Sequence, residues 1–242
     1  MTAPPTPATL ADQLAAAGYA ILPALYAEAE LAALLACIES APVAGPNFRR
    51  SQDVFAIRNL LGELPELLPL LLTPKLREVL VGLFPAGCHL TKAIYFDKPA
   101  GSNWLVAWHQ DLMINVAERA DLPGFGPWTA KAGWVAVQPP VSFLENTVTL
   151  RLHLDECDAT NGALKVVPTS HRQGVVPAEA IVSQTSTATI CAVPAGAIML
   201  MKPLLLHASS RSTSTRPRRV IHLEFSSEEL PAGLAWRERR AV

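Results

Sequence analysis

The sequence is poor in charge and in cysteine, and both shortages exclude classes of protein. Only 17% of the 242 residues are charged and the formal net charge is −1, whereas a dedicated nucleic-acid binder carries a clustered excess of lysine and arginine. The four cysteines contain no C-x-x-C pair, so a zinc ribbon or a redox motif is disfavoured and reduced thiols in the cytoplasm are expected. Half of the residues are hydrophobic, which excludes a disordered chain.

Targeting and membrane segments are lacking as well. The first seven residues have neither the basic nor the apolar region of a secretory signal. The two most apolar stretches, 64–72 and 195–206, are interrupted by proline and charged residues, and neither supplies the roughly 20 apolar residues that cross a bilayer. We therefore expect no membrane and no nucleic acid among the partners, but a small-molecule substrate, with the chain acting as a monomer or homodimer.

The pattern of apolar residues divides the chain near residue 87. Before it, helical spacing predicts helices at 9–17, 28–40, 65–72 and 75–84, with a short strand at 19–22 and a loop at 41–53. After it, alternation predicts strands at 89–97, 104–111, 133–137, 147–155, 163–167, 195–201 and 218–225. Short strands without interleaved helices favour a sandwich or barrel. We expect one domain over 1–242, with a loose leader (1–8), a mostly helical part (9–86) and a β core (87–226).

The predicted strand 147–155 has two different faces. Val148, Leu150, Leu152 and Leu154 share one face, whereas the intervening threonines, Arg151, His153 and Asp155 share the other. The polar face fits a half-solvated strand and a ligand cavity equally well at this stage.

Familiar catalytic motifs are absent, which leaves the histidines as the candidates for chemistry. The chain has no G-x-S-x-G elbow, no phosphate-binding loop and no G-x-G-x-x-G turn. In Trp108-His109-Gln110-Asp111, the imidazole and the carboxylate are two residues apart on an extended chain and point to the same side. With a third ligand from a distant strand they would form the 2-His-1-carboxylate triad that suits non-haem Fe(II).

The third ligand is ambiguous from the residues alone. A second His-x-Asp occurs at His153–Asp155, and the remaining histidines are His89, His171, His207 and His222. His207 stands out because it follows an apolar run and precedes Arg218 by eleven residues. A buried guanidinium matches the planar carboxylate of a dicarboxylate such as 2-oxoglutarate.

Taken together, these motifs resemble the phytanoyl-CoA dioxygenase (PhyH) family of Fe(II)- and 2-oxoglutarate-dependent oxygenases. The resemblance covers most of the chain. It is carried by Gly18-Tyr-Ala-Ile-Leu-Pro23, Trp108-His-Gln-Asp111, Asn161-Gly-Ala-Leu-Lys-Val-Val-Pro-Thr-Ser-His171, His207-Ala-Ser209 and Arg218-Arg219.

The resemblance implies a mainly β fold with flanking helices: a double-stranded β-helix, that is, a cupin-like jelly roll, preceded by N-terminal helices. It implies that His109, Asp111 and His207 hold Fe(II), that Arg218 holds the distal carboxylate of 2-oxoglutarate and that Ser209 supports it. The reaction implied is hydroxylation by O₂ of a small organic substrate, with release of succinate and CO₂. Halogenating relatives lack the carboxylate that Asp111 supplies here.

Other roles are expected with less support from the pattern. Lys92 and Arg151 are assigned to the co-substrate, with a solvated lysine and an Arg151–Asp155 ion pair as the alternatives. Trp108, Gln110 and Lys131 are assigned to the substrate, because the long insertion 115–132 and nearby tryptophans suggest a partly aromatic pocket.

Two departures from the family and several rival functions stay open. Thr169 stands where relatives carry glycine, which predicts a strained or differently shaped turn, and Arg151 stands where an aromatic residue is common. Desaturation, epimerisation and ring formation remain alternatives to hydroxylation. A non-catalytic jelly-roll binding protein and a cupin-like metalloenzyme without 2-oxoglutarate are the rival functions.

Overall fold

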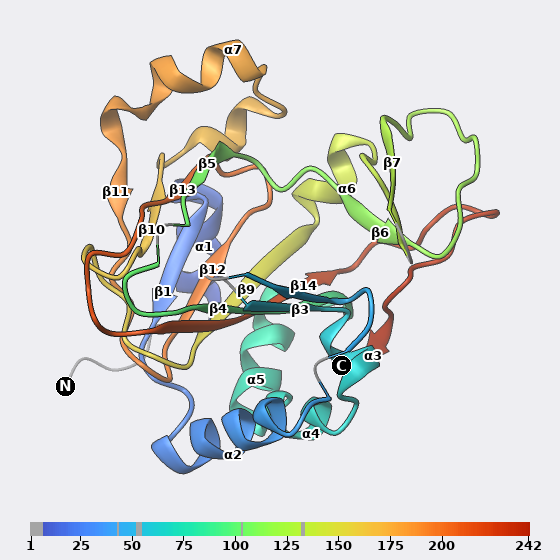
Figure 1. Ribbon diagram of the computed structural model, residues 1–242. Coiled ribbons are helices and arrows are strands. Elements are labelled where there is room, and N and C mark those ends of the chain that lie inside the picture. Colours follow the sequence, from blue (N-terminus) through green and yellow to red (C-terminus); the bar gives the residue numbers. More distant parts are fainter. Residues whose placement is uncertain (1–6, 43, 52–54, 103, 132–133) are drawn as a thin grey trace.

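The chain folds around two antiparallel sheets that lie one above the other. The computed structural model describes residues 7–42, 44–51, 55–102, 104–131 and 134–242 (Figure 1). In this part, the large sheet has the strand order β1-β12-β9-β14-β4-β3-β2, with β15 also paired to β4. Its strands are β1 Tyr19–Leu22, β2 Phe48–Arg50, β3 Phe55–Arg58, β4 His89–Lys98, β9 Thr147–His153, β12 Ile198–Met201, β14 Arg218–Ser226 and β15 Arg240–Ala241.

The second sheet is shorter and lies across the large one. Its order is β11-β10-β13-β5, formed by β5 Val106–His109, β10 Leu164–Val166, β11 Thr189–Ile190 and β13 His207–Ser209. A third sheet, β6-β8-β7, is formed by β6 Ile114–Val116, β7 Trp128–Lys131 and β8 Trp134–Val137 and stands to one side (Figure 1). The predicted jelly roll is confirmed, and it is open rather than a closed barrel.

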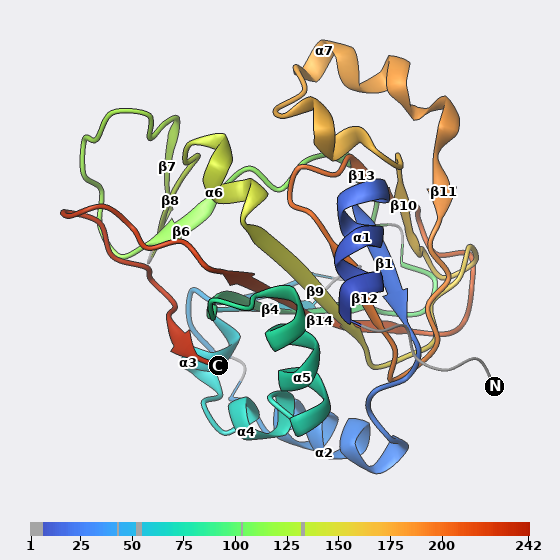
Figure 2. The same cartoon turned by 180° about the vertical axis from the view of Figure 1, so that it is seen from behind.

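Helices from the first third of the chain cover the outer face of the large sheet. Figure 2 shows α1 (Pro7–Ala17) and α5 (Pro74–Leu83) lying against it, with α2 (Glu28–Glu39) and α4 (Leu67–Leu71) beneath and the short α3 (Leu60–Glu63) beside them. Helix α5 begins where the sequence requires, because Thr73 accepts a hydrogen bond from the Leu76 amide at 3.3 Å and Pro74 follows it. Among the described residues, no helix has the length and apolar character that crossing a membrane demands.

Strand β9 separates the helical layer from the space between the sheets. Its leucine face belongs to the same apolar cluster as the helices, whereas Arg151 points the other way and lines a cavity. All seven residues of β9 are buried, so the half-solvated interpretation of this strand is wrong. Both of its faces are covered, and the polar face lies inside the protein.

Several elements differ from the expected ones. Helix α1 begins at Pro7, inside the expected leader, and β2 occupies part of the expected loop because Phe48 pairs with Ile57 of β3. Short helices α6 (Val141–Glu145) and α7 (Ala178–Ile181) interrupt the strands that were expected to follow one another directly. The 3₁₀ turns η1 (Ser170–Gln173) and η2 (Val182–Thr187) flank α7. The expected strand 104–111 ends at His109, since the Asp111 amide donates to the Pro203 carbonyl outside the sheet.

The departure at Thr169 has a visible structural effect. Thr169 has φ 70° and ψ −10°, the left-handed region that β-branched residues avoid. Its side chain is exposed and makes no capping hydrogen bond, while its amide donates to Ala17 and its carbonyl accepts from Arg172. Glycine would keep both backbone bonds and remove the conformational cost.

Thr169→Gly is therefore expected to stabilise the protein. The free energy of unfolding should rise by about 1 kcal/mol. This is the cost of the left-handed conformation for threonine, reduced by the greater conformational entropy that glycine has in the unfolded chain. It corresponds to a rise of about 2–4 °C in Tm. Differential scanning calorimetry measures this. Asn59→Gly is the matched control, because Asn59 also has a positive φ, 50°, yet asparagine tolerates that region. Equal shifts for both variants would contradict the explanation.

His153 is the other unusual residue of β9. It is 2% exposed, and neither ring nitrogen has a hydrogen-bond partner among the residues that the structure describes. Asp155, two residues on, accepts hydrogen bonds from Arg219. Burial, reinforced by the charges of Arg151 and Arg218, lowers the pKa of His153 well below 6.5. In the folded protein this imidazole is therefore neutral, and its hydrogen-bonding capacity is unused.

His153→Leu is expected to stabilise the protein more strongly in acid. At pH 7.5 the gain should be about 1–2 kcal/mol, because an unsatisfied buried polar group disappears. Below about pH 6.5 His153 is protonated in the unfolded chain but stays neutral in the folded protein. The wild type therefore loses stability as the pH is lowered, whereas the leucine variant does not. Urea unfolding at pH 7.5 and 5.5 should show the difference widening by about 1.4 kcal/mol. A difference independent of pH would refute the assigned cause.

Candidate metal and carboxylate site

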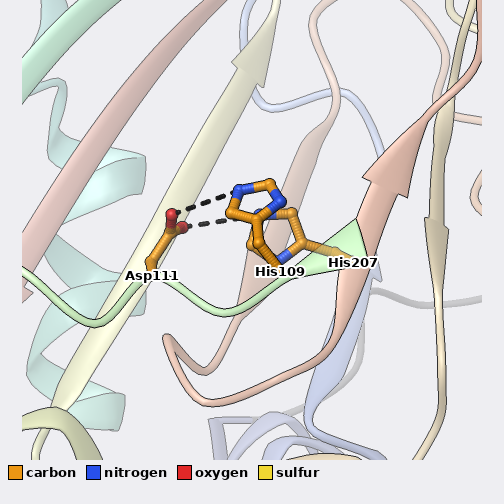
Figure 3. Close-up of side chains that lie close together, drawn as sticks. All are labelled: His109, Asp111 and His207. Atoms are coloured by element: carbon orange, nitrogen blue, oxygen red, sulfur yellow. Dashed lines mark ion pairs between the residues drawn. The ribbon is translucent and has the colours of Figure 1, made fainter. Parts of the chain in front are cut away.

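Three side chains meet at one end of the small sheet. His207 of β13 is paired in register with His109 of β5, so their side chains extend from the same face and their ring centroids lie 4.1 Å apart. Asp111 follows β5, and its backbone amide donates to Pro203 at 2.9 Å. Figure 3 shows the carboxylate facing both imidazole rings. The motif and the distant histidine are therefore brought together by strand pairing.

The ring nitrogens of both histidines are assigned by their backbone contacts. Nδ1 of His109 lies 2.8 Å from the Ala107 carbonyl, and Nδ1 of His207 lies 2.9 Å from the Leu205 carbonyl. A carbonyl only accepts, so each Nδ1 donates its proton and each Nε2 carries a lone pair. Nε2 of His109 lies 3.7 Å from Asp111 Oδ1, and Nε2 of His207 lies 3.6 Å from Oδ2.

This arrangement fits a metal cation. Three electron-rich atoms lie within 4.8 Å of one another, and ligand atoms held about 2.1 Å from one ion lie within about 4.2 Å of each other. Burial lowers the pKa of His207 to about 4, although the charge of Asp111 acts in the opposite direction. At neutral pH the imidazole is therefore neutral, and its Nε2 carries no proton toward the carboxylate. Asp111 Oδ2 is buried without a hydrogen-bond partner. A cation between the three groups would satisfy all of them.

A cavity of about 340 Å³ opens beside these residues, between the sheets. Besides the three side chains it is lined by Arg218, Ser209, Arg151 and Lys92. His109 is 39% exposed and Asp111 24%, whereas His207 is 5% exposed. The candidate metal position is therefore accessible from the cavity and closed on the side of β13.

Arg218 and Ser209 offer unused polar atoms to this cavity. Arg218 is 3% exposed; it donates through Nη1 to the Gly162 carbonyl, and its Nε has no partner. Ser209 is 1% exposed and its hydroxyl is likewise without a partner. Gly162 has φ +83°, and a Cβ there would lie 2.7 Å from the Ser210 carbonyl, so the turn that orients Arg218 needs glycine.

Arg151 and Lys92 are joined through two further residues. Arg151 Nη1 lies 3.2 Å from Nδ1 of His222, whose Nε2 lies 3.2 Å from Glu224 Oε1. Lys92 completes the chain with a 2.7 Å ion pair to the same oxygen. Burial and the charge of Arg218 lower the pKa of Arg151 to about 10. His222 and Glu224 use their polar atoms within this hydrogen-bonded network. They are therefore better explained as residues that hold Arg151 and Lys92 in place than as metal ligands.

Arg219 and Arg151 have the partners that the sequence left open. Arg219 binds Asp155 through Nε at 2.9 Å and Nη2 at 2.7 Å, on the face opposite Arg218. The expected alternative of an Arg151–Asp155 pair is therefore wrong, since Arg151 lines the cavity instead. Lys92 is likewise in the cavity wall and paired, not solvated.

The three residues expected at the substrate behave differently from one another. Trp108 packs against the apolar cluster of Val167, Val176 and Leu206 and is not part of the cavity wall. The Gln110 amide donates to the Gly174 and Leu204 carbonyls and accepts from the Val176 amide, so it holds loops together. The side chain of Lys131 lies outside the described residues.

Sequence reasoning missed several cavity residues. Arg58, Phe96, Glu224 and Arg237 line the cavity but belong to no motif. Only the alternation of β14, which places Arg218, His222 and Glu224 on one face, could have indicated one of them. The others depend on strand pairing and on the return of the C-terminal segment.

Comparisons with known proteins agree with this arrangement. The model of the phytanoyl-CoA dioxygenase (PhyH) family matches residues 14–220, while no curated protein sequence matches the chain. The solved structure of EctD from S. alaskensis with bound Fe is 19% identical, with a TM-score of 0.70, over 93% of this chain and 79% of that one.

Two further structures show the same fold. The alpha-ketoglutarate-dependent carbocyclase SnoK from nogalamycin biosynthesis is 17% identical, with a TM-score of 0.68, over 98% of this chain and 90% of that one. EvdO2 from Micromonospora carbonacea var. aurantiaca, complexed with 2-oxoglutarate, is 17% identical, with a TM-score of 0.63, over 95% and 96%.

Proposed function

Because this chain belongs to the phytanoyl-CoA dioxygenase (PhyH) family, we propose that His109, Asp111 and His207 hold its Fe(II) and that Arg218 and Ser209 bind its 2-oxoglutarate. The chain is a 2-oxoglutarate-dependent non-haem iron oxygenase that uses O₂. The observation that carries this proposal is the convergence of two Nε2 lone pairs and a carboxylate within 3.7 Å.

The protein's contribution at the metal is to fix the orientation of the ligands. Each histidine donates a hydrogen bond to the backbone carbonyl two residues before it, His109 to Ala107 and His207 to Leu205. This contact sets both the orientation of the ring and its tautomer. The Pro203 carbonyl holds the Asp111 backbone. Three protein ligands leave positions for a chelating co-substrate and O₂.

At the other end of the co-substrate, buried cations receive the carboxylate. Arg218 presents Nε, and Ser209 presents its hydroxyl, with neither atom bonded elsewhere. Burial and, after it, the charge of the neighbouring Arg218 lower the pKa of Arg151. A dianion relieves that repulsion, and the planar guanidinium fork is matched to a carboxylate.

Iron and 2-oxoglutarate supply the oxidising chemistry once bound, with succinate and CO₂ as the products of the co-substrate. The chain supplies a cavity that excludes bulk water and positions a C–H bond beside the metal. We propose hydroxylation of a small organic molecule, because the cavity volume of about 340 Å³ is at the lower end of small-ligand sites. We further propose a cytoplasmic monomer or homodimer, consistent with four free thiols.

Anaerobic reconstitution tests the proposal directly. Purified protein loaded with Fe(II) should bind 2-oxoglutarate with a weak visible charge-transfer band, and substrate in air should stimulate succinate release. Metal binding without the band would favour a cupin-like enzyme that uses no 2-oxoglutarate. A band without succinate release across a broad panel of small acids and secondary metabolites would favour the binding protein.

A further inference from the structure

The cavity has a second cationic end, away from the residues assigned to 2-oxoglutarate. Arg58, on β3, and Arg237, in the C-terminal segment, both line it. The Arg58 amide donates to the Asn47 carbonyl at 2.8 Å, and Arg237 Nη2 donates to Asn47 Oδ1 at 3.0 Å. One buried asparagine therefore anchors the backbone of one arginine and the guanidinium of the other.

The register of the large sheet sets how far this end lies from the co-substrate. Arg58 pairs with Ile94, Ile94 with His222, and His222 with Arg151, so one row of side chains crosses four strands on the cavity face. Three steps of about 4.8 Å place the Cα atoms of Arg58 and Arg151 about 14 Å apart. The two cationic ends are thus separate sites on one wall.

Among the side chains that line the cavity, cations outnumber carboxylates. There are five cationic side chains against the two carboxylates of Asp111 and Glu224. Glu224 pairs with Lys92, Asp111 faces the histidines, and a bound dianion would balance Arg218 and Arg151. Arg58 and Arg237 then remain, with the buried carboxylate of Glu238, outside the cavity wall, near Arg237. Among the described residues, the Arg58 guanidinium has no hydrogen bond or ion pair, and burial together with the nearby Arg49 lowers its pKa.

Aromatic side chains line the same cavity as the two arginines and the metal ligands. Phe96 and Trp104 line the cavity with ring centroids 6.2 Å apart, and Phe96 also packs edge-on against His222 at 6.1 Å. This wall suits an apolar or planar molecular body. A molecule lying along it reaches the metal with one end and the arginines with the other.

We infer that the primary substrate carries an anionic group, a carboxylate or a phosphate ester, which Arg58 and Arg237 bind while its body lies against Phe96 and Trp104. The inference rests on the proposed function, because it assumes that Arg218 and Arg151 are occupied by 2-oxoglutarate. The guanidinium groups of Arg58 and Arg237 supply both the positive charge and the paired N–H donors that bind either a carboxylate or a phosphate.

Anion binding to the loaded enzyme tests this inference. Protein with Fe(II) and saturating 2-oxoglutarate, kept anaerobic, is titrated calorimetrically with inorganic phosphate, 3-phenylpropionate and the neutral 3-phenylpropionamide. At least one of the two anions should bind saturably. If the site prefers a carboxylate, 3-phenylpropionamide should bind at least tenfold more weakly than 3-phenylpropionate. Arg58→Gln and Arg237→Gln should each weaken the anion at least tenfold and leave 2-oxoglutarate affinity unchanged.

The outcomes separate the inference from the proposed function. Arg50→Gln is the matched control, because Arg50 is exposed on the neighbouring β2 and outside the cavity wall. Tighter phosphate binding assigns phosphate esters, and tighter phenylpropionate binding assigns carboxylic acids. Normal 2-oxoglutarate binding with no saturable anion binding, or with anion binding indifferent to Arg58 and Arg237, overturns the inference alone. Failure of 2-oxoglutarate to bind the wild type overturns the proposed function.

Discussion

Asp111→Asn is expected to abolish substrate-stimulated succinate release and to weaken Fe(II) binding by more than about 100-fold, since groups that merely orient a ligand already cost 10–100-fold. The amide keeps the size of the carboxylate but removes its negative charge. It also places an N–H group opposite one of the two Nε2 atoms that lie 3.6 and 3.7 Å away. Succinate assay and metal titration by calorimetry measure the two effects.

Asp121→Asn is the control for this variant. The Asp121 side chain is 86% exposed and, among the residues that the structure describes, pairs with Arg119 alone, so metal affinity and succinate release should match the wild type. The folded apoprotein should tolerate Asp111→Asn, because in the described part of the chain the Asp111 carboxylate has no ion-pair partner besides the two histidines. Iron affinity unchanged by Asp111→Asn would remove Asp111 from the metal site, whatever happened to activity.

Arg218→Ala is expected to raise the Kd for 2-oxoglutarate about 100-fold while Fe(II) remains bound. A charge-assisted bidentate contact is worth about 1.5–3 kcal/mol, and each 1.4 kcal/mol is a factor of ten in affinity. The charge-transfer band, titrated with 2-oxoglutarate under anaerobic conditions, reports the affinity. Arg218→Lys should recover part of it, because it restores the charge without the fork.

Arg219→Ala is the neighbouring control. Arg219 is committed to Asp155 through two side-chain hydrogen bonds, so its loss should lower thermal stability and leave 2-oxoglutarate affinity unaltered. Should Arg218→Ala bind 2-oxoglutarate normally, Arg151 becomes the carboxylate receptor, since it is the other buried guanidinium beside the metal site.

The parts of the site that sequence predicted are those governed by local spacing. His109 and Asp111 are two residues apart, and Arg218 is separated from Arg219 by the alternation of β14. Alternation predicted that Arg218 and Arg219 lie on opposite faces of their strand, and the family resemblance selected Arg218 as the one that faces the cavity. The leucines of β9 followed the same alternation, and the jelly-roll class followed from the strand lengths and the family resemblance.

The parts that sequence could not predict depend on contacts between distant segments. Arg58 lies in the cavity because β3 pairs with β4, and Arg237 does so because the C-terminal segment returns to Asn115. Neither pairing leaves a local signal. Gln110 shows another limit of the pattern: it lines the cavity, as a substrate residue would, but its amide also binds the Gly174, Leu204 and Val176 backbone, which no local spacing indicates.

The contribution of the C-terminal segment to the cavity has a practical consequence for engineering. The family model ends at residue 220, whereas Arg237 lies beyond it, next to Trp236, which packs against His89, and to Glu238, which accepts from the Ala93 amide. Residues 227–242 contain none of the proposed iron ligands and not Arg218, but they are built into the fold through Trp236, Glu238 and the pairing of β15 with β4. A chimera that exchanges this segment between homologous enzymes should therefore carry its packing partners on β4 along with it.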